Sequence, residues 1–494
     1  MHGVSVDFET YRALAEDATV VPVVLPLLAD ALTPVLAWST IGGGLGSYLL
    51  ESVEHGEKWG RFSFVGYRPQ LLVRGRRGRF EVERDGRITS AEVDDPWPSL
   101  RALLAEWVPP TEGVADLPPF WGGAVGYVAY DAVRTFEPTV GERHADPEAW
   151  DFSFAVGGTL LAFDDLRQRA YAICCRRIEG DPRATYEDSV AELKVLSDEL
   201  SRPRIPRLLA PPTVGFDGEL PPSSYTREGF EDAVCAAQEY ILAGDIFQVV
   251  LGQRFTVPAR GVDLFDVYRM LRAINPSPYM YMLKMPGMGI AGASPETLVR
   301  VQNGVAEVRP IAGTRRRGAS AAEDAERADD LLADPKERAE HVMLVDLGRN
   351  DLGRISKPGT VRITEEMIIE RYSHVMHMVS NVVGELADDK DALDVLAATF
   401  PAGTLSGAPK VRAMQIIEEQ EPVARGVYGG AVGYISFDGN LDVAIAIRTV
   451  VETEGEVRVQ AGAGIVEASD PAKEYDETVN KARAALGAVE AARR

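Results

Sequence analysis

The sequence predicts an α+β fold, and three observations support this prediction. Amphipathic helical patterns and apolar strand patterns occur in mixed order in the second half of the chain, without a regular βαβ repeat. Hydrophobic residues make up 46% and charged residues 26% of the 494 residues, as in globular proteins. A proline-rich segment separates two parts, each of the size of one domain.

The segment 201–222 (SRPRIPRLLAPPTVGFDGELPP) holds six prolines and little apolar periodicity, which is typical of an extended linker. It predicts an N-terminal domain over residues 1–222, with the linker at its end, and a C-terminal domain over residues 223–494.

The N-terminal part has a β-rich pattern with interspersed helices. Residues 71–89 predict a hairpin, whose arginines we interpret as a solvated surface because acidic residues follow at once. The string GGAVGY occurs at residues 122–127 and again at 429–434, each time within a predicted buried strand. One shared string is a weak indication of an internal repeat.

The C-terminal part alternates helices with strands. The 3.6-residue and two-residue periods of its apolar positions distinguish the two types. Helices are predicted over residues 226–243, 327–347, 408–419 and 471–492, and strands over residues 246–255, 289–301, 443–451 and 457–462.

The charge of the chain excludes some partners. There are 75 acidic and 52 basic residues, so the net charge is −23 and a nucleic-acid partner is not expected. An anionic substrate would need a basic pocket or a bound cation. The most apolar stretch, residues 20–38, is interrupted by three prolines and an aspartate, so no membrane partner is expected either.

The three cysteines form no CxxC and no disulfide framework, which suits a reducing cytosol. The first residues are acidic and have no basic region before the first apolar run, so we expect no signal peptide. A cytoplasmic location follows as an expectation.

Two predicted helices each carry a pair of acids three residues apart. Glu337 and Glu340 share one helix face, and Glu474 and Glu477 share another. Four carboxylates on two facing helices form an oxygen ligand set that Mg²⁺ accepts. Solvated surface acids in an acidic protein are the alternative, and the spacing leaves both interpretations open.

Other features point less specifically to a binding site. Glycine-rich strand ends at residues 291–296, 427–433 and 461–465 allow close approach of a ligand or form ordinary turns. Arg448 in an apolar run is an edge residue or a carboxylate clamp. No phosphate-binding loop, dinucleotide loop or serine elbow is present. These residues alone indicate an α+β enzyme with a small anionic substrate.

Ten ordered motifs resemble the chorismate-utilising enzymes, and most closely the large subunits of anthranilate synthase. The resemblance implies two antiparallel sheets sandwiched with helices, interlocked with an N-terminal regulatory α/β region. The motifs from residue 226 onward are GDIFQVVLGQRF, SPETLVR, RPIAGTRRRG, EHVMLVDLGRNDLGRI, VMHMVSNVVGEL, FPAGTLSGAPKVRAM, YGGAVGY, AIAIRT, QAGAGIV and EYDETVNKA.

Two positions distinguish the reactions of this family. Hydroxyl-adding members, the isochorismate and salicylate synthases, have a lysine where this chain has Gln248, because attacking water needs a base whereas ammonia has a free lone pair. Ala312 stands where aminodeoxychorismate synthases typically have a lysine. The resemblance therefore favours a lyase that converts chorismate and ammonia to anthranilate and pyruvate in tryptophan biosynthesis. An aminodeoxychorismate synthase large subunit of the folate pathway is the alternative, and a non-catalytic tryptophan sensor is the alternative outside catalysis.

The resemblance also implies roles for individual residues. Glu340 and Glu477 would bind Mg²⁺ directly, Glu337 and Glu474 through water. Glu296 would be the general acid for the departing 4-hydroxyl, which needs a raised pKa, and His377 would act in pyruvate elimination. The remaining residues that the resemblance places at the substrate are Gln248, Thr404, Tyr428, Arg448, Gly462, Ala463, Gly464 and Lys481.

The motifs LLES and NPSPYM resemble a feedback site for tryptophan. Glu51 and Ser52 would contact the amino acid, while Pro278, Tyr279 and Met280 would line its pocket. No cysteine lies in the context of a glutaminase nucleophile. The resemblance therefore implies a hetero-oligomer with a separate glutamine amidotransferase subunit that delivers the ammonia.

Overall fold

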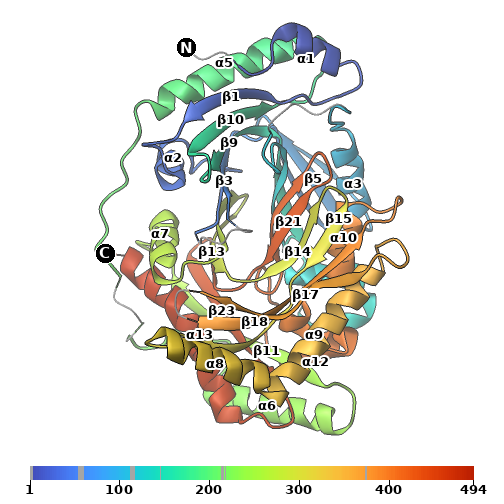
Figure 1. Ribbon diagram of the computed structural model, residues 1–494, viewed down its shortest axis with the longest axis vertical. Helices are drawn as coiled ribbons and strands as arrows, with labels where there is room; N and C mark the ends of the chain where they lie inside the picture. The colour runs from blue at the N-terminus through green and yellow to red at the C-terminus, as the bar shows by residue number, and fades with distance from the viewer. Residues whose placement is uncertain are drawn as a thin grey trace.

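The computed structural model describes residues 4–53, 60–111, 117–144, 146–212, 216, 218–372 and 375–493, and structural statements refer to these residues. Two antiparallel sheets of eleven and twelve strands face each other, with helices on their outer sides, as Figure 1 shows. The predicted α+β fold with two antiparallel sheets and helices is confirmed.

The first sheet has the order β1-β10-β9-β3-β2-β12-β13-β22-β23-β11-β19. Its strands are β1 (Val23–Leu28), β10 (Arg169–Cys175), β9 (Gly158–Asp164), β3 (Phe62–Tyr67), β2 (Tyr48–Glu51), β12 (Tyr279–Met285), β13 (Met288–Ser294), β22 (Thr449–Thr453), β23 (Glu456–Ile465), β11 (Gln248–Pro258) and β19 (Gly407–Ala408).

The second sheet has the order β16-β18-β15-β14-β21-β20-β7-β8-β4-β5-β6, and β17 pairs with β18 beside this path. Its strands are β16 (Ile311–Arg316), β18 (Val375–Glu385), β15 (Val305–Val308), β14 (Thr297–Gln302), β21 (Leu441–Ile445), β20 (Ala431–Ser436), β7 (Gly123–Val128), β8 (Phe152–Val156), β4 (Leu71–Arg76), β5 (Arg79–Arg84), β6 (Arg87–Ala91) and β17 (Arg362–Arg371).

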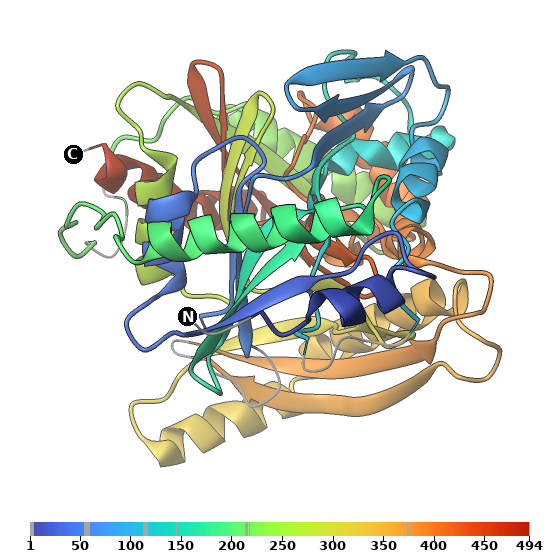
Figure 2. The ribbon, with the colours of Figure 1, turned by 90° about the horizontal axis from the view of Figure 1, so that it is seen from above.

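The helices lie on the outer faces and at the ends of the sheets. In Figure 2, α5 lies across the strands at the β1 end of the first sheet. The helices are α1 (Phe8–Leu14), α2 (Pro34–Ile41), α3 (Trp97–Ala105), α4 (Val133–Phe136), α5 (Pro182–Leu200), α6 (Arg227–Leu242), α7 (Leu264–Ile274), α8 (Ala321–Ala333), α9 (Pro335–Gly353), α10 (Ala392–Thr399), α11 (Gly403–Ser406), α12 (Lys410–Gln420) and α13 (Pro471–Ala492).

Both sheets take strands from both sides of residue 222. β2 pairs with β12, so that Leu50 lies opposite Tyr281. β7 pairs with β20, and the two GGAVGY strings form this pair with Gly126 opposite Gly433. The described part of the proline-rich segment contains no helix or strand. The division into domains at this segment stays a prediction.

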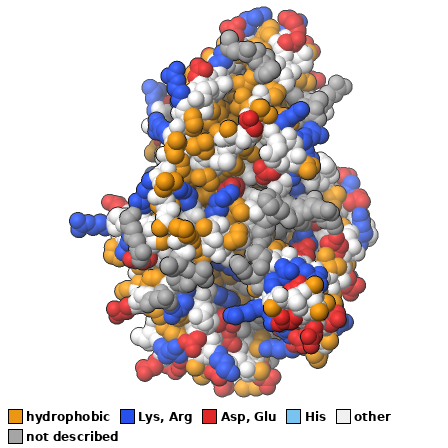
Figure 3. Space-filling model, turned by 60° about the vertical axis from the view of Figure 1, so that its left-hand side comes forward, with side chains coloured by type: hydrophobic (Ala, Val, Ile, Leu, Met, Phe, Trp, Pro, Cys, Tyr) orange, Lys and Arg blue, Asp and Glu red, His pale blue; other side chains and the backbone are white. Residues whose placement is uncertain are grey.

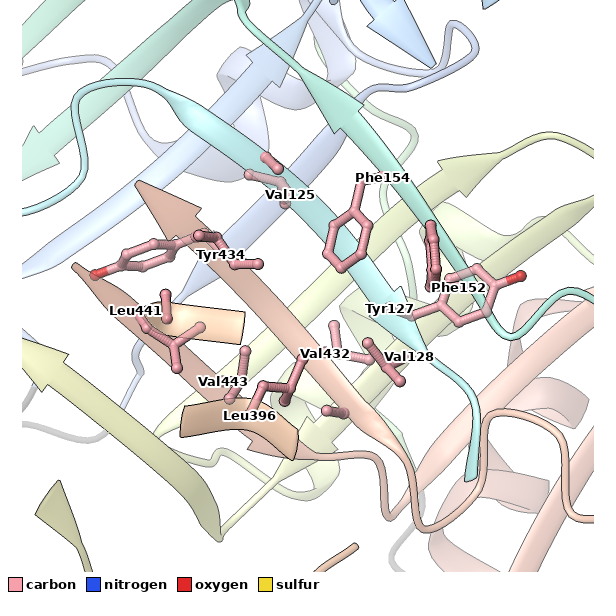
Figure 4. Packing of buried hydrophobic residues seen from close by; sticks show 14 of the residues in the cluster. Val125, Tyr127, Val128, Phe152, Phe154, Leu396, Val432, Tyr434, Leu441 and Val443 are labelled. Carbon is pink, nitrogen blue, oxygen red and sulfur yellow. The ribbon is translucent and has the colours of Figure 1, made fainter. Parts of the chain in front are cut away.

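The main core lies between the two sheets. Figure 4 shows aromatic and branched side chains of β7, β8, β20 and β21 packed together with Leu396 of α10. Phe64 of the first sheet meets Tyr434 of the second edge to face, with ring centroids 5.9 Å apart. Each fully buried side chain of this kind contributes about 1.5–3 kcal/mol to folding.

A second core lies between the outer face of the first sheet and its helices. Val479 and Leu486 of α13 pack there with Val267 of α7 and Val459 of β23. The start of α13 follows from local chemistry, because the Asp470 side chain accepts hydrogen bonds from the Ala472 and Lys473 amides and Pro471 occupies the first turn.

Three predicted elements are each divided in two, which corrects the sequence analysis. The strand predicted over 289–301 is β13 and β14, one in each sheet, and the strand predicted over 443–451 is β21 and β22, again one in each sheet. The helix predicted over 327–347 is the end of α8 and the start of α9. Asp334 between them is extended because it precedes Pro335, and its side chain caps α9.

The predicted hairpin over 71–89 has a third strand, β6, whose residues are all exposed. Basic and acidic side chains are interspersed on the face of the molecule in Figure 3. Within the described residues, no helix is both long enough and apolar enough to cross a bilayer.

Candidate active site

The two chain segments that cross from one sheet to the other lie side by side. One joins β13 to β14 through Glu296, and the other joins β21 to β22 through Arg448. The Ile445 amide donates to the Glu296 carbonyl at 3.0 Å, and the Ala293 amide donates to the Arg448 carbonyl at 3.2 Å. Arg448 has a φ of +51°, which is unusual for a residue other than glycine and frequent at functional sites.

The protonation of Glu296 is strongly altered by its surroundings. Burial raises the pKa of its carboxyl to about 7, against the hydrogen bond from Thr404 and the charges of Arg448 and Lys481, which lower it. Thr404 Oγ1 donates to Glu296 Oε1 at 2.8 Å. A carboxyl group with this pKa holds its proton near neutral pH and can serve as a general acid.

Two cationic side chains flank Glu296. Arg448 is exposed and donates from Nη1 to Asn275 Oδ1 at 3.1 Å. Lys481 donates to the Gly462 carbonyl at 3.0 Å and pairs with Glu477 at 2.6 Å. They provide local positive charge in a chain of net charge −23, which suits an anionic ligand.

The glycines of β23 allow two polar side chains to approach its backbone. A Cβ on Gly462 would lie 2.7 Å from the Tyr428 hydroxyl, and a Cβ on Gly464 would lie 2.7 Å from Gln248 Nε2. At either position, a larger residue would force the facing side chain to move. Ala463, which lies between them, points to the opposite side and is fully buried.

The four predicted metal ligands lie near the starts of α9 and α13. Burial, followed by the neighbouring charge of Glu337, raises the pKa of Glu340, and Glu477 adds to this effect. The pKa of Glu474 is also raised, by burial and then by Glu477. The side chain of Gln248 lowers the pKa of Glu340 by hydrogen bonding.

These carboxylates fit a hard cation in chemistry, because they are oxygen donors that repel one another. Glu337 already pairs with Arg315 at 3.3 Å, and Glu477 with Lys481 at 2.6 Å. In the described ranges, no three carboxylate, imidazole or thiol side chains converge closely enough to hold a metal ion. Their role as ligands stays a prediction.

His377 lies on β18 opposite Thr314 of β16. Its Nδ1 is 3.0 Å from the Gly313 carbonyl, which can only accept, so Nδ1 carries the hydrogen and Nε2 has a free lone pair. Burial lowers the pKa of His377, and the charge of Arg448 lowers it further. The ring is therefore neutral at neutral pH.

All five residues of the predicted effector site line one cavity of about 980 Å³ between the sheets. The Glu51 carboxylate is held by Arg272, with distances of 2.9 and 3.0 Å, and by the Tyr268 hydroxyl. The Ser52 hydroxyl is buried and has no hydrogen-bond partner among the described residues. The five residues are Glu51, Ser52, Pro278, Tyr279 and Met280.

Sequence analysis missed the partners that hold these side chains in place. Asn275 and Arg315 lie within the quoted motifs NPSPYM and RPIAGTRRRG, but their partners Arg448 and Glu337 are distant in sequence. The sequence marked Asn275 and Arg315 only as members of these motifs. Membership of a motif does not show which distant residue a side chain contacts.

Comparison with known proteins identifies the family of the chain. The sequence profile of a family described as chorismate binding enzyme matches residues 53–487. The chain belongs to this family of chorismate-binding enzymes.

Individual chorismate-binding enzymes resemble the chain over its full length. Proteins named anthranilate synthase component 1 from Aquifex aeolicus and Pseudomonas putida are each 46% identical to it, over 99% and 97% of this chain and 98% and 97% of their own lengths. The crystal structure of anthranilate synthase component I from Streptococcus pneumoniae aligns with a TM-score of 0.74 at 37% identity, covering 92% of this chain and 98% of that one.

The menaquinone-specific isochorismate synthase from Escherichia coli has the same fold at 19% identity, with a TM-score of 0.70 and 97% of each chain covered. This chain is an enzyme of the chorismate-binding family, and it shares its fold with this isochorismate synthase.

Proposed function

We propose that this chain is the large subunit of an anthranilate synthase and converts chorismate and ammonia to anthranilate and pyruvate. The observation that carries the proposal is the neutral amide of Gln248 beside the carboxylate of Glu340. An amide cannot remove a proton from attacking water, whereas ammonia attacks with its own lone pair. The names of the full-length relatives support the same reaction.

In the proposed reaction, ammonia attacks C2 of the ring while Glu296 donates its proton to the departing 4-hydroxyl. Arg448 binds the enolpyruvyl carboxylate, and Lys481, Thr404, Tyr428 and the backbone of residues 462–464 surround the rest of the substrate. The neutral imidazole of His377 then assists pyruvate elimination. Loss of the C2 hydrogen as a proton and of the enolpyruvyl group as pyruvate makes the ring aromatic for the first time.

We further propose that Mg²⁺ is the cofactor. Glu340 and Glu477 would bind it directly, and Glu337 and Glu474 would bind it through water. A bound divalent cation supplies positive charge to the ring carboxylate of chorismate. Burial, and after it the repulsion between these acids, raises the pKa of Glu340 and Glu474, and a bound cation would offset both effects.

Regulation by tryptophan is the third part of the proposal. The effector would occupy the cavity between the sheets, where Ser52 offers an unsatisfied hydroxyl and the two sheets supply aromatic walls. The cavity is lined by strands of both sheets, and the catalytic crossovers join the same sheets. A ligand that fixes their relative position therefore couples to catalysis.

A separate glutamine amidotransferase is proposed as the partner, in agreement with the component 1 names of the relatives. Cys174 and Cys175 are buried, and burial raises the pKa of both thiols, which is unsuited to a nucleophile. A cytoplasmic location, with no nucleic-acid or membrane partner, completes the proposal.

The experiment is a product assay with purified protein, chorismate, Mg²⁺ and ammonium. We expect anthranilate, recognised by its fluorescence, and inhibition by tryptophan. Accumulation of 4-amino-4-deoxychorismate would instead identify the folate-pathway enzyme. Turnover to isochorismate or salicylate without ammonium would contradict the role of Gln248.

A further inference from the structure

A buried ion pair follows helix α12 and precedes β20. Arg425 is 2% exposed and Glu421 is 5% exposed. Arg425 Nε donates to Glu421 Oε2 at 2.9 Å, and Nη2 donates to Oε1 at 2.5 Å. Removing both charges from water is costly, and an apolar pair of similar volume is often as stable. Stability alone is therefore a weak reason for this pair.

The remaining donors of Arg425 reach two other segments. Nη1 donates to the Leu405 carbonyl at 2.6 Å, and Nη2 also donates to the Val250 carbonyl at 2.8 Å. Leu405 directly follows Thr404, and Val250 lies two residues after Gln248. Glu421 Oε1 accepts the Gly252 amide at 2.7 Å, which fixes the same strand a second time.

The pair also contacts a third and a fourth segment of the site. The guanidinium carbon of Arg425 lies 5.6 Å from the ring centroid of Tyr428 and 4.5 Å from that of Tyr130. The Arg425 carbonyl accepts from Gln460 Nε2 at 2.7 Å, two residues before Gly462. Three segments of the site therefore meet at the Arg425 side chain, and a fourth, β23, is tied to its backbone carbonyl.

We propose that the buried Arg425–Glu421 pair positions the active site by holding the turn that carries Thr404, the start of β11 that carries Gln248, and Tyr428 at fixed mutual distances. This inference rests on the proposed function, which places these three residues at the substrate. A guanidinium suits the role because its planar fork presents five donors in fixed directions.

The test is the Arg425→Lys variant. Lysine keeps the charge that pairs with Glu421, but a single ammonium cannot reproduce both carboxylate bonds and both carbonyl bonds. We expect kcat/KM to fall about 10- to 100-fold, as for other small misplacements of catalytic groups, while circular dichroism stays native. Turnover is followed as loss of chorismate, so the comparison does not depend on which product forms.

Arg74→Lys is the matched control. Arg74 also pairs with a buried carboxylate, since its Nε is 2.6 Å from Glu81 Oε2, but it lies on β4 at the far end of the second sheet. Any activity lost through destabilisation by this exchange would appear in both variants. We expect unchanged kcat/KM for Arg74→Lys.

The double variant Arg425→Met, Glu421→Leu separates positioning from stability. Removing both charges avoids leaving a buried ion without its partner. We therefore expect the double variant to have a higher Tm than Arg425→Met alone or Glu421→Leu alone. We expect turnover to stay low, because the Leu405 and Val250 carbonyls still lack their anchor. Restored turnover in the double variant, or kcat/KM of Arg425→Lys within about twofold of wild type, would overturn the proposal.

The outcome is distinguishable from failure of the proposed function. If the wild type consumes chorismate without forming anthranilate, the identity of the product is wrong. The comparison of chorismate loss between Arg425→Lys and Arg74→Lys still decides the positioning role.

Discussion

Thr404 donates a 2.8 Å hydrogen bond to Glu296, and the two residues are 108 positions apart in the chain. Thr404 lies on the short helix α11, and Glu296 lies where the chain crosses between the sheets. The bond stabilises the carboxylate form of Glu296 and thus opposes the burial that raises its pKa. The pKa of the proposed general acid therefore depends on one hydroxyl group.

Thr404→Val should move the pH dependence of kcat/KM. Without the hydroxyl, the carboxylate form is less stable and the pKa of Glu296 rises above about 7. Because the acid must be protonated to act, the loss of activity at rising pH should shift to higher pH. Thr404→Ser, which keeps the hydroxyl, is the control. If the fall of kcat/KM at rising pH occurred at the same pH in Thr404→Val as in wild type, Glu296 would be excluded as the acid.

Glu296→Gln should lower kcat by about 10²–10⁴-fold, which is the usual contribution of a general acid. It should also change how stability depends on pH. The folded wild type keeps the Glu296 proton up to a pKa of about 7, whereas an unfolded glutamate loses it near 4.5. The contribution of the protonated Glu296 to the free energy of unfolding is thus fully present below pH 4.5 and is lost as pH rises through about 7.

The corresponding loss is of the order of 3 kcal/mol, at 1.36 kcal/mol for each unit of pKa change. Glutamine does not ionise, so the variant should gain in Tm relative to wild type as pH rises from 5 to 8. Thermal melts at several pH values measure this difference. Parallel Tm curves for the two proteins would mean that Glu296 is ordinarily ionised.

Glu340→Gln should abolish Mg²⁺-dependent turnover while the fold stays intact. The substitution removes one negative charge from a group of acids that repel one another, so apo-protein stability should stay equal or rise. A Mg²⁺ titration of chorismate turnover measures the effect. Glu490→Gln, an exposed change on α13, is the control. Undiminished activity in Glu340→Gln would reject the metal assignment.

Ser52→Ala should relieve tryptophan inhibition and leave kcat without effector unchanged. Ser52 lines the cavity, and its buried hydroxyl has no partner in the described structure, so we expect its removal to destabilise the apo-protein little. The measurement is the tryptophan concentration for half inhibition. Ser90→Ala on the exposed β6 is the control. Equal inhibition of all three proteins would place the effector elsewhere.

Gly464→Ala should lower turnover by displacing one side chain. The added Cβ would lie 2.7 Å from Gln248 Nε2, so the amide must move away from its present place beside Glu340. Gly353→Ala near the end of α9 meets no atom within 4 Å and should be neutral or stabilising. Native kcat/KM in Gly464→Ala would show that the position of the amide does not matter.

Residue types and local starts of elements were predictable from sequence, and the positions of the breaks were not. The helix over 471–492 agrees with α13, because its cap and its first proline are local signals. The strand predicted over 289–301 has apolar residues on both sides of Pro295 and Glu296, since both β13 and β14 bury side chains. The proline marks a break in the pattern, but a local break does not show that the chain changes sheets there.

The sequence alone determined which chemical groups are available: the spaced glutamates, the neutral amide at Gln248, and the glycines of β23. Tertiary structure decided which groups meet. The two crossovers place Glu296 and Arg448 side by side, and the fold brings Thr404 to Glu296 and Arg425 to Leu405 and Val250. Such contacts join distant segments, and their geometry depends on strand order and packing between the sheets, which no local pattern encodes.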